Sequence, residues 1–347
     1  MQTAVVILNW NGAGLLRQFL PSVVQTVHED AVVVVADNGS TDNSVAILEQ
    51  EFPTVRLCKL DKNYGFAEGY NRALQWVDHE IAPSIYVLLN SDVKTPEGWL
   101  APLVERICSE ENIGAVMPKL RSYREPEYFE YAGAAGGFID GLGYPYCRGR
   151  ILDQIEKDEG QYDTPCVIDW ASGACLVVKS KTYWAVAGLE GRFFAHMEEI
   201  DLCWRMRRAG YVIFCEPRAT VFHLGGGSLP NNSPRKIYLN FRNNLLMLRR
   251  NLPIGGRKRC IMTLRLCLDW AAALVFLLKG KPKLFIAVFR AHGSYFAMRR
   301  DFPFLQMRGS KVTHLGVVSI LYQYYLCGRK RFSSLLRSGV KSSQSYE

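Results

Sequence analysis

The sequence predicts an α/β fold whose first third is a mostly parallel sheet built from βαβ units. Short, β-branched apolar runs alternate with segments long enough for a helix, as in strands joined by helical crossovers. The runs end in polar residues, and in such sheets ligands bind beyond the carboxyl ends of the strands. The expected strands are 4–10, 31–40, 54–60 and 84–92.

Helix signals fall between and after these strands. Segments 40–52 and 65–80 are expected to be helices. Segment 95–111 has a strong start signal, with Thr95 as N-cap, Pro96 at the first helical position and Glu97 in the first turn. These helices would cover the sheet.

The pattern loosens after the fourth strand. Segment 121–168 is rich in Gly and Tyr and predicts either an irregular stretch or short hairpins. Regular structure returns with one strand at 167–180, an aromatic loop and helix at 193–211, and two strands at 211–228 that end in a Gly-rich loop.

Charge divides the 347 residues into two parts. Residues 1–230 carry 20 Lys and Arg against 30 Asp and Glu, a net charge of −10, whereas 231–347 carry 22 against 3, a net charge of +19. A basic segment with interleaved aromatics suits nucleic acid or an anionic membrane, and the sign alone does not choose between them. We predict a catalytic domain over 1–235 and a basic, apolar helical region over 236–347.

Cysteine usage and hydropathy bear on location. The ten cysteines include no C-x-x-C pair, and we interpret them as reduced thiols of a cytosolic protein. The apolar segment 260–280 is interrupted by Arg265 and Asp269, which leaves too few uncharged residues for a membrane span. The amphipathic pattern favours helices that lie in an interface, with a solvated helical cap as the alternative.

Three carboxylates, Glu198, Glu199 and Asp201, lie between Phe193-Phe194 and a basic helical run. Acids at a helix start favour the macrodipole, and this explains the charges. It does not explain the aromatics, which would form an apolar wall that raises the pKa of a carboxylate toward that of a general base.

Three further residues end strands and are ambiguous individually. Asp37 begins the turn-forming string "DNGSTD", where an Asx-turn is as probable as a ligand contact. Asp92 ends "LLNSD" and would suit a hard divalent ion, or simply a turn. His223 precedes three glycines that would let backbone N–H groups approach a phosphate, although a structural histidine is the commoner case.

Taken together, these segments resemble the inverting family 2 glycosyltransferases of the GT-A fold, most closely the bacterial rhamnosyltransferase-like subgroup. The resemblance covers roughly residues 3–250. The segments that carry it are "VVILNWNG", "VVADNGSTDNS", "NYGFAEGYN", "LLNSDV", "SGACLVVKS", "GLEGRFFAHMEEIDLCWRMRRAGY", "VFHLGGGS" and "NFRNNLLMLRR".

The resemblance implies a role for each matching residue. Asp92 would be the metal-linked carboxylate, His223 would lie near the diphosphate and metal, and Glu199 occupies the position where the family usually has a catalytic Asp. Glu198 and Asp201 are the other candidates for the catalytic base. The donor-binding set is Leu8, Asn9, Trp10, Asp37, Asn63, Gly65, Asn71, Asn90 and Ser91, and the acceptor-side set is Trp170, Gly173, Trp204 and Arg205.

The implied reaction is a single displacement at the anomeric carbon of a nucleoside-diphosphate sugar, with a divalent metal, Mg²⁺ or Mn²⁺, as cofactor. A rhamnose-like sugar is favoured, while UDP, dTDP and GDP donors all stay open. The acceptor would be a glycan or lipid-linked glycan at the cytoplasmic face of a membrane, where the basic region binds anionic lipid. A non-catalytic nucleotide-sugar or glycan-binding protein is the alternative, and the acidic first two thirds oppose nucleic-acid binding.

Overall fold

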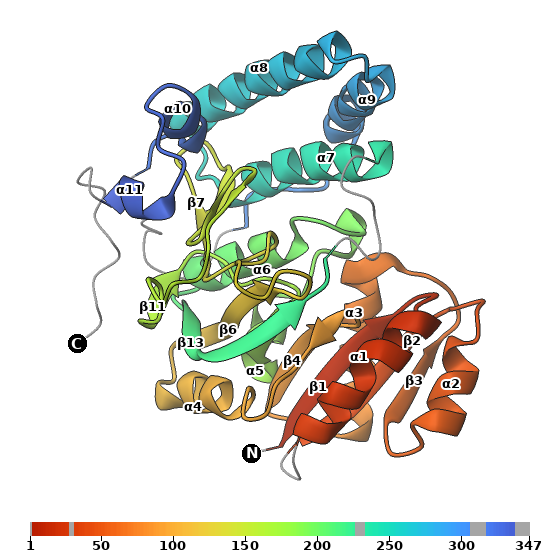
Figure 1. Cartoon of the computed structure of the whole chain (residues 1–347). Coiled ribbons are helices and arrows are strands. Elements are labelled where there is room, and N and C mark those ends of the chain that lie inside the picture. The colour runs from red at the N-terminus through yellow and green to blue at the C-terminus, as the bar shows by residue number, and fades with distance from the viewer. Residues whose placement is uncertain (1, 28–30, 226–232, 306–316, 337–347) are drawn as a thin grey trace.

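The computed structural model describes residues 2–27, 31–225, 233–305 and 317–336. Its centre is a nine-stranded mixed sheet of order β11-β13-β6-β12-β4-β1-β2-β3, with β5 paired to β13 (Figure 1). The strands are β1 (Thr3–Asn9), β2 (Ala31–Asn38), β3 (Arg56–Leu60), β4 (Ile85–Asn90), β5 (Val93–Lys94), β6 (Ile113–Ser122), β11 (Cys166–Ile168), β12 (Cys175–Lys179) and β13 (Val212–His223).

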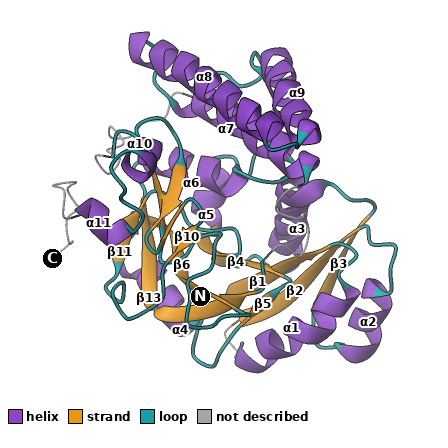
Figure 2. Ribbon diagram, turned by 45° about the horizontal axis from the view of Figure 1, so that its top comes forward, coloured by secondary structure: helices purple, strands orange, loops and turns teal. Residues whose placement is uncertain are grey.

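The first half of this sheet matches the sequence-based expectation. β1 pairs in parallel with β2 and β4, and β2 pairs in parallel with β3, so all four carboxyl ends lie at one edge. Helices cover both faces, with α1 and α2 on one side and α3 on the other (Figure 2). The bounds are α1 (Ala13–Thr26), α2 (Ser44–Glu51) and α3 (Gly65–Glu80).

The predicted start of the next helix is wrong. Helix α4 spans Ala101–Ser109 and therefore begins six residues after Thr95. Thr95 is buried against α1, where its N–H donates to Ser22 and its hydroxyl lies 3.0 Å from that of Thr26. Trp99 is also buried there and donates to Thr26. Residues 95–100 thus pack as an extended turn on α1, because this contact outweighs the local capping signal.

Two strand predictions also need correction. Segment 167–180 holds two strands, β11 and β12, separated by residues 169–174. The described part of segment 211–228, up to residue 225, holds one strand, β13, that pairs in parallel with β6 and whose register shifts between Glu216 and Thr220. Glu216 is buried at this bulge and forms ion pairs with Arg106 and Arg218, which keeps the strand continuous through Pro217. The predicted Gly-rich loop lies mostly outside the described residues.

Segment 121–168 forms short hairpins. They make a four-stranded antiparallel sheet of order β10-β9-β8-β7 beside the β6 and β13 end of the main sheet (Figure 1). The strands are β7 (Gly137–Ile139), β8 (Pro145–Cys147), β9 (Arg150–Ile151) and β10 (Gln154–Ile155).

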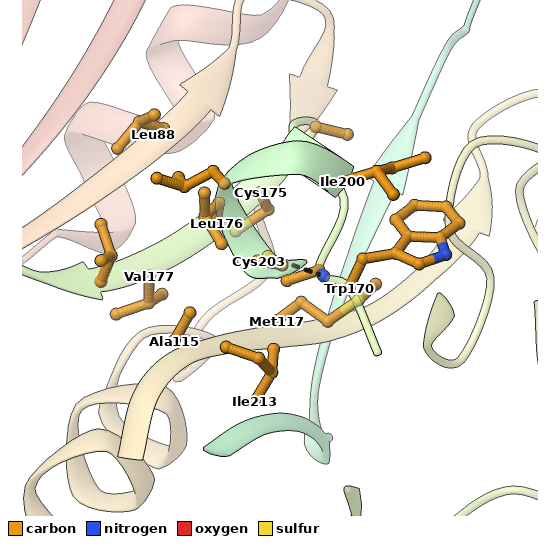
Figure 3. Close-up of a cluster of buried hydrophobic side chains, with 14 of the residues drawn as sticks. Leu88, Ala115, Met117, Trp170, Cys175, Leu176, Val177, Ile200, Cys203 and Ile213 are labelled. Atoms are coloured by element: carbon orange, nitrogen blue, oxygen red, sulfur yellow. Dashed lines mark hydrogen bonds between the residues drawn. The ribbon is translucent and has the colours of Figure 1, made fainter. Parts of the chain in front are cut away.

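Helix α6 (Glu198–Arg208) packs on the β12 and β6 part of the main sheet. Ile200 and Cys203 enter the same apolar cluster as Leu176 and Met117 (Figure 3). The preceding elements are helix α5 (Ser180–Ala185) and a 3₁₀ turn over Gly191–Phe193. This packing fixes the polar start of α6 at the carboxyl edge of the strands.

The basic third is helical, and its first helix shares the core of the sheet. Leu245 to Leu248 of α7 (Pro234–Asn251) belong to the same buried cluster as the strands. Helices α8 (Gly256–Leu278) and α9 (Pro282–Met298) form a hairpin that stacks on α7 away from the sheet (Figure 2). The predicted domain boundary at residue 235 stays a prediction. Two short helices follow, α10 (Ile320–Tyr325) and α11 (Phe332–Leu336).

One described helix, α8, is long and apolar enough to cross a membrane by length and composition, with a mean hydropathy of 1.9 over its best window. Its two internal charges face the protein. Asp269 lies 3.3 Å from His292 of α9 and 3.6 Å from Arg265. Arg265 donates to the Leu142 carbonyl and lies over the Tyr144 ring. Both charges are therefore compensated inside the fold.

Candidate active site

Asn9 and Asp37 face each other where β1 and β2 end. They are register partners, and Asn9 Nδ2 donates to Asp37 Oδ1 over 3.0 Å. The other carboxylate oxygen of Asp37 accepts from the Ser40 N–H, and Asp37 is 3% exposed. Trp10, the next residue, is half exposed at the rim. The Asp37 side chain thus closes the turn through the N–H three residues on, not the two residues on of the Asx-turn expected as one option. The contact of Asp37 with a base stays a prediction.

At the start of α3, the "NYGFAEGYN" segment (63–71) meets the loop that contains Phe194. Asn63 Oδ1 accepts from the Gly65 N–H and from Asn38. Gly65 has φ +79°, and a Cβ there would lie 2.5 Å from the Phe194 ring. The ring thus occupies the space that a side chain would fill, which is why this position needs glycine.

Asn71 points away from this edge. Its side chain donates to the Leu189 carbonyl and accepts from Tyr183 and from the Leu189 N–H. All these partners belong to the segment that leads into the 193–197 loop. The predicted donor-binding role of Asn71 therefore has a structural alternative, a link between α3 and that segment.

Asp92 and His223 meet at the carboxyl edge beyond β4. His223 Nε2 lies 3.1 Å from Asp92 Oδ1 and 3.4 Å from Asn90 Nδ2. On its other side, His223 Nδ1 lies 3.3 Å from a Glu130 carboxylate oxygen. Burial alone would lower the pKa of His223, but the carboxylates of Glu130 and Asp92 outweigh it and raise the pKa to about 10.

This donor set fits a divalent metal bound jointly with a diphosphate. One carboxylate oxygen and one imidazole nitrogen face each other, and oxygen with imidazole ligands suits Mn²⁺ and related ions. The raised pKa of His223 means that a metal would have to displace a proton from the ring before Nε2 could act as a ligand. No cluster of three or more His, Cys, Asp or Glu with metal-binding geometry occurs among the described residues. The protein would therefore supply two donors, and the substrate or water would supply the rest.

Glu130 was not predicted. It lies in the loosely patterned segment 121–168, where no motif marks it, and only the fold brings it to His223. Together with His223, Gly225 and Lys236 it lines a cavity of about 630 Å³ between the small sheet and the end of β13. The cavity lies on the opposite side of Asp92 from Asp37, as the strand order shows.

Glu198 and Glu199 occupy the first turn of α6. Glu198 is 5% exposed, and Glu199 is partly exposed. Burial raises the pKa of Glu199 to about 7. Burial and the neighbouring Glu199 charge raise the pKa of Glu198 well above its ordinary value. One oxygen of each carboxyl is buried without a hydrogen-bond partner in the protein. Both carboxyl groups therefore hold their protons more tightly than ordinary glutamates, and the charge of one opposes ionisation of the other.

Glu199 lies near the Asp92 edge of the sheet. A Cβ on Gly173 would lie 3.9 Å from Glu199 Cβ and 3.4 Å from the Phe66 ring. The next residue, Ala174, accepts a hydrogen bond from the Asn90 N–H. The start of α6, Gly173 and the 90–92 turn thus form one continuous surface. Of the acceptor-side set, Gly173 is the residue that the structure brings to Glu199.

The other acceptor-side residues are buried. Trp170 is 3% exposed, points into the apolar cluster and donates to the Phe138 carbonyl (Figure 3). Trp204 is also 3% exposed, and Arg205 is fully buried, where it donates to Asp201 and the Gly188 carbonyl. An acceptor contact does not fit such burial. These side chains stabilise the fold around α6 instead.

Asp201 is buried in the same way, which removes it from the list of candidate bases. Its carboxylate accepts from Arg205 and from Asn251 of α7, and it is 0% exposed. Both of its oxygens are already hydrogen-bonded inside the protein, so neither can reach an acceptor hydroxyl.

The loop before α6 has unusual backbone geometry. Phe194, His196 and Met197 have φ of 67°, 71° and 72°. With ψ −59° at Phe194 and a 2.8 Å hydrogen bond from the Ala195 N–H to the Phe193 carbonyl, the chain makes a positive-φ γ-turn. Each such residue costs about 1–3 kcal/mol and persists where surrounding contacts impose it. This conformation sets the direction in which α6 begins.

Comparison with known proteins identifies the family. Residues 4–171 match the family described as Glycosyl transferase family 2. An N-acetylglucosaminyl-diphospho-decaprenol L-rhamnosyltransferase of Mycobacterium tuberculosis is 27% identical over 238 residues, which are 63% of this chain and 75% of the relative. The chain is therefore similar to glycosyltransferase family 2 over the first half of its length. The enzyme is thus a glycosyltransferase that resembles rhamnosyltransferases.

Solved structures support the GT-A-like fold. GalNAc-T7, solved with UDP, GalNAc and Mn²⁺, aligns with a TM-score of 0.56 at 14% identity, covering 72% of this glycosyltransferase and 48% of that chain. Staphylococcus aureus TarS 1–349, solved with UDP-GlcNAc, aligns with a TM-score of 0.53 at 13% identity, covering 86% and 90% of the two chains. At these identities the likeness shows the fold alone.

Proposed function

We propose that this glycosyltransferase moves a sugar, with inversion, from a nucleoside-diphosphate donor to a hydroxyl of a glycan or lipid-linked acceptor in cell-surface polysaccharide synthesis. The observation that carries the proposal is Glu199, a partly exposed carboxylate with a pKa of about 7 beside the Asp92 edge of the sheet. A general base works best with a pKa near the operating pH.

Each residue at the edge then has one task. Glu199 takes the proton of the acceptor hydroxyl as its oxygen attacks the anomeric carbon. Glu198 is the buried neighbour of the base, and burial and the Glu199 charge raise its pKa well above the ordinary value. Asp92 and His223 would hold a divalent metal, which neutralises charge on the departing diphosphate when bound. A rhamnose-like sugar is favoured because the Mycobacterium tuberculosis relative is named an L-rhamnosyltransferase.

The nucleotide would bind at the ends of β1 and β2. Asn9, Asp37 and the exposed Trp10 lie there, at the opposite end of the polar edge from the cavity beside Glu130. GalNAc-T7 was solved with UDP and TarS with UDP-GlcNAc, so two proteins of similar fold bind uridine nucleotides. This chain's own nucleotide is to be found by experiment.

A binding panel tests the donor site. Purified protein is titrated by calorimetry with UDP-, dTDP- and GDP-sugars, with and without Mn²⁺, and the titrations are repeated on Asp92→Ala and Glu199→Gln. We expect metal-dependent binding of one donor that is lost in Asp92→Ala and retained in Glu199→Gln. Binding without any turnover would instead favour the non-catalytic alternative, and no binding under any condition would refute the proposed donor site.

We also propose that the α8–α9 hairpin holds the enzyme on the cytoplasmic face of an anionic membrane. The two helices expose apolar side chains while their internal charges Arg265 and Asp269 are buried against the protein. A helix that lies in the interface needs this arrangement, with one apolar face outward. The exposed apolar residues are Leu264, Trp270, Leu274, Val275, Leu277, Leu278, Ile286, Phe289 and Phe296.

Cosedimentation with vesicles tests this placement. The +19 charge of residues 231–347 predicts binding to anionic vesicles that weakens in high salt, and little binding to neutral vesicles. Full-length protein that stays in the supernatant with anionic vesicles at low salt would contradict it.

A further inference from the structure

The polar cluster Arg242-Asn243 of α7 contacts the 193–197 loop that precedes the catalytic helix. Arg242 Nη2 donates to the carbonyls of Arg192 (3.1 Å) and Phe193 (3.0 Å). Asn243 Nδ2 lies 2.8–3.0 Å from the carbonyl oxygens of Phe193, Ala195 and His196. Asn243 is 0% exposed and Arg242 8% exposed, so neither interaction competes with bulk water.

The network fixes which way the Asn243 amide points. Arg242 Nε donates to Asn243 Oδ1 over 2.8 Å, and a guanidinium cannot accept a hydrogen bond. The amide oxygen must therefore face Arg242, and the NH₂ group must face the loop carbonyls. The two side chains act as one unit, with Arg242 orienting Asn243.

The loop is held from its other side by α3. The Phe194 carbonyl accepts from the N–H groups of Phe66 (2.6 Å) and Ala67 (3.2 Å), at the start of that helix. The Phe194 ring fills the space beside Gly65, and Arg235 of α7 lies over the ring at 4.7 Å. A strained turn is thus enclosed between two helices that are more than 150 residues apart in the sequence.

We propose that Arg242 and Asn243 are positioning residues that hold the 193–197 loop in its positive-φ form and thereby fix where the Glu199 carboxylate lies. Neither residue is placed to contact the reacting atoms. The inference rests on the proposed function for the role of Glu199, but the clamp itself is a claim about the structure. It also makes α7 part of the catalytic unit, although the helix belongs to the basic third of the chain.

The test compares Asn243→Asp and Arg242→Lys with Asn240→Ala. Asn243→Asp keeps the size and the acceptor for Arg242 but replaces the donor to the loop by a carboxylate oxygen. Arg242→Lys keeps the charge but loses the planar guanidinium group, whose Nη2 donates to the carbonyls of Arg192 and Phe193. Asn240 is the matched control because it lies on the same helix and donates only to the Lys236 carbonyl of its own helix.

We would measure kcat of each variant with the UDP-, dTDP- or GDP-sugar that the wild type turns over. We expect kcat to fall about 100-fold in Asn243→Asp, the scale of a misplacement of about 1 Å in an active site. The calorimetric Kd for the donor should stay within about threefold, and Arg242→Lys should fall in between. Asn240→Ala should match the wild type. A role in folding alone would instead lower the amount of active protein and leave kcat per active site unchanged.

Hydrogen–deuterium exchange gives a readout that does not need activity. In Asn243→Asp, exchange of the amides in 193–199 and of Phe66 and Ala67 should accelerate, while exchange in β1 and β4 stays unchanged. Unchanged exchange in 193–199 together with unchanged kcat would overturn the inference. If the wild type turns over none of the sugars, the proposed function fails while exchange still decides whether the clamp exists. If Asn243→Asp does not fold, Arg242→Lys carries both measurements.

Discussion

The two glutamates that begin α6 differ in exposure, and this difference separates their roles. Glu199 is partly exposed with a pKa of about 7, whereas Glu198 is buried and its pKa lies well above the ordinary value because of burial and the Glu199 charge. Replacing the accessible base and replacing its buried neighbour should therefore have different consequences.

Glu199→Gln should lower kcat by about 100- to 10,000-fold, the range attributed to a positioned general base. Glu198→Gln replaces the buried neighbour by a side chain of similar size, leaves the base in place and should retain at least about a tenth of the activity. In the wild type and in Glu198→Gln, kcat/KM should fall as the pH drops below about 7, because Glu199 becomes protonated. Loss of activity in Glu198→Gln with survival in Glu199→Gln would reverse the assignment. Initial rates between pH 5 and 9 decide this.

The Glu199 carboxyl group also affects the free energy of unfolding. Its pKa is raised in the folded state, so the folded protein holds the proton more tightly than the unfolded chain, and stability falls as the pH rises from about 4.5 through about 7. Glu199→Gln removes this penalty. The variant should gain roughly 1–3 kcal/mol in the free energy of unfolding at pH 8 and nothing below pH 4. Urea unfolding at both pH values measures the difference, and an equal gain at both would contradict this linkage.

At the scale of elements, the α8–α9 hairpin combines a buried ion cluster with an exposed apolar face. Asp269→Ala leaves Arg265 and His292 buried without their carboxylate, which should destabilise the protein by about 3–5 kcal/mol. Lys279→Ala, an exposed residue at the end of α8, is the control and should change stability by less than about 0.5 kcal/mol. A thermal shift for Asp269→Ala no larger than the control's would show that the cluster does not hold the hairpin.

The apolar face of the hairpin predicts how membrane binding responds to substitution. Leu274 is 54% and Phe289 is 59% exposed. Replacing both with Glu removes apolar contacts of about 1.5–3 kcal/mol each and adds negative charge, so binding to anionic vesicles should weaken more than 10-fold. Lys283→Gln, which removes one charge from the same hairpin, should weaken it only a few-fold. Equal effects of the two changes would indicate binding by charge alone.

Local periodicity predicted β1 to β4 and the helices α2 and α3 well, because these strands are short apolar runs and the helices fill the segments between them. It failed where tertiary contacts decide. Thr95 has every local mark of an N-cap, yet it is tied to α1. Two strands were expected in 211–228, yet one strand runs through Pro217, where Glu216 holds the bulge together with Arg106.

The site was predictable only in part, for a related reason. Residues at strand ends, such as Asp92 and His223, follow from the rule that sheet edges bind ligands. Glu130 carries no local signal, since only the fold brings it to His223. Arg242 and Asn243 did carry a local signal, because they are adjacent polar residues within a leucine-rich helix. Both side chains are buried in the structure. Conversely, Trp170, Trp204 and Arg205 looked functional in the motifs but are core residues.

At the scale of the whole molecule, the polar edge of the sheet runs from Asp37 past Asp92 to the cavity beside Glu130, and α6 meets it near the middle. The basic helices stack on α6 through α7, so the face proposed to bind the membrane and the candidate site belong to one continuous body (Figure 1). A lipid-linked acceptor held at the membrane would have its sugar near this edge.

The central claim is a single displacement with Glu199 as base, and the stereochemistry of the product tests it most directly. The sugar nucleotide that binds is incubated with the enzyme, and the anomer first released to water or to an acceptor is identified by proton NMR before it equilibrates. We expect an anomeric configuration opposite to that of the donor, and product from Glu199→Gln only at the strongly reduced rate given above. A product that retains the donor's configuration, or one formed at the wild-type rate by Glu199→Gln, would contradict it.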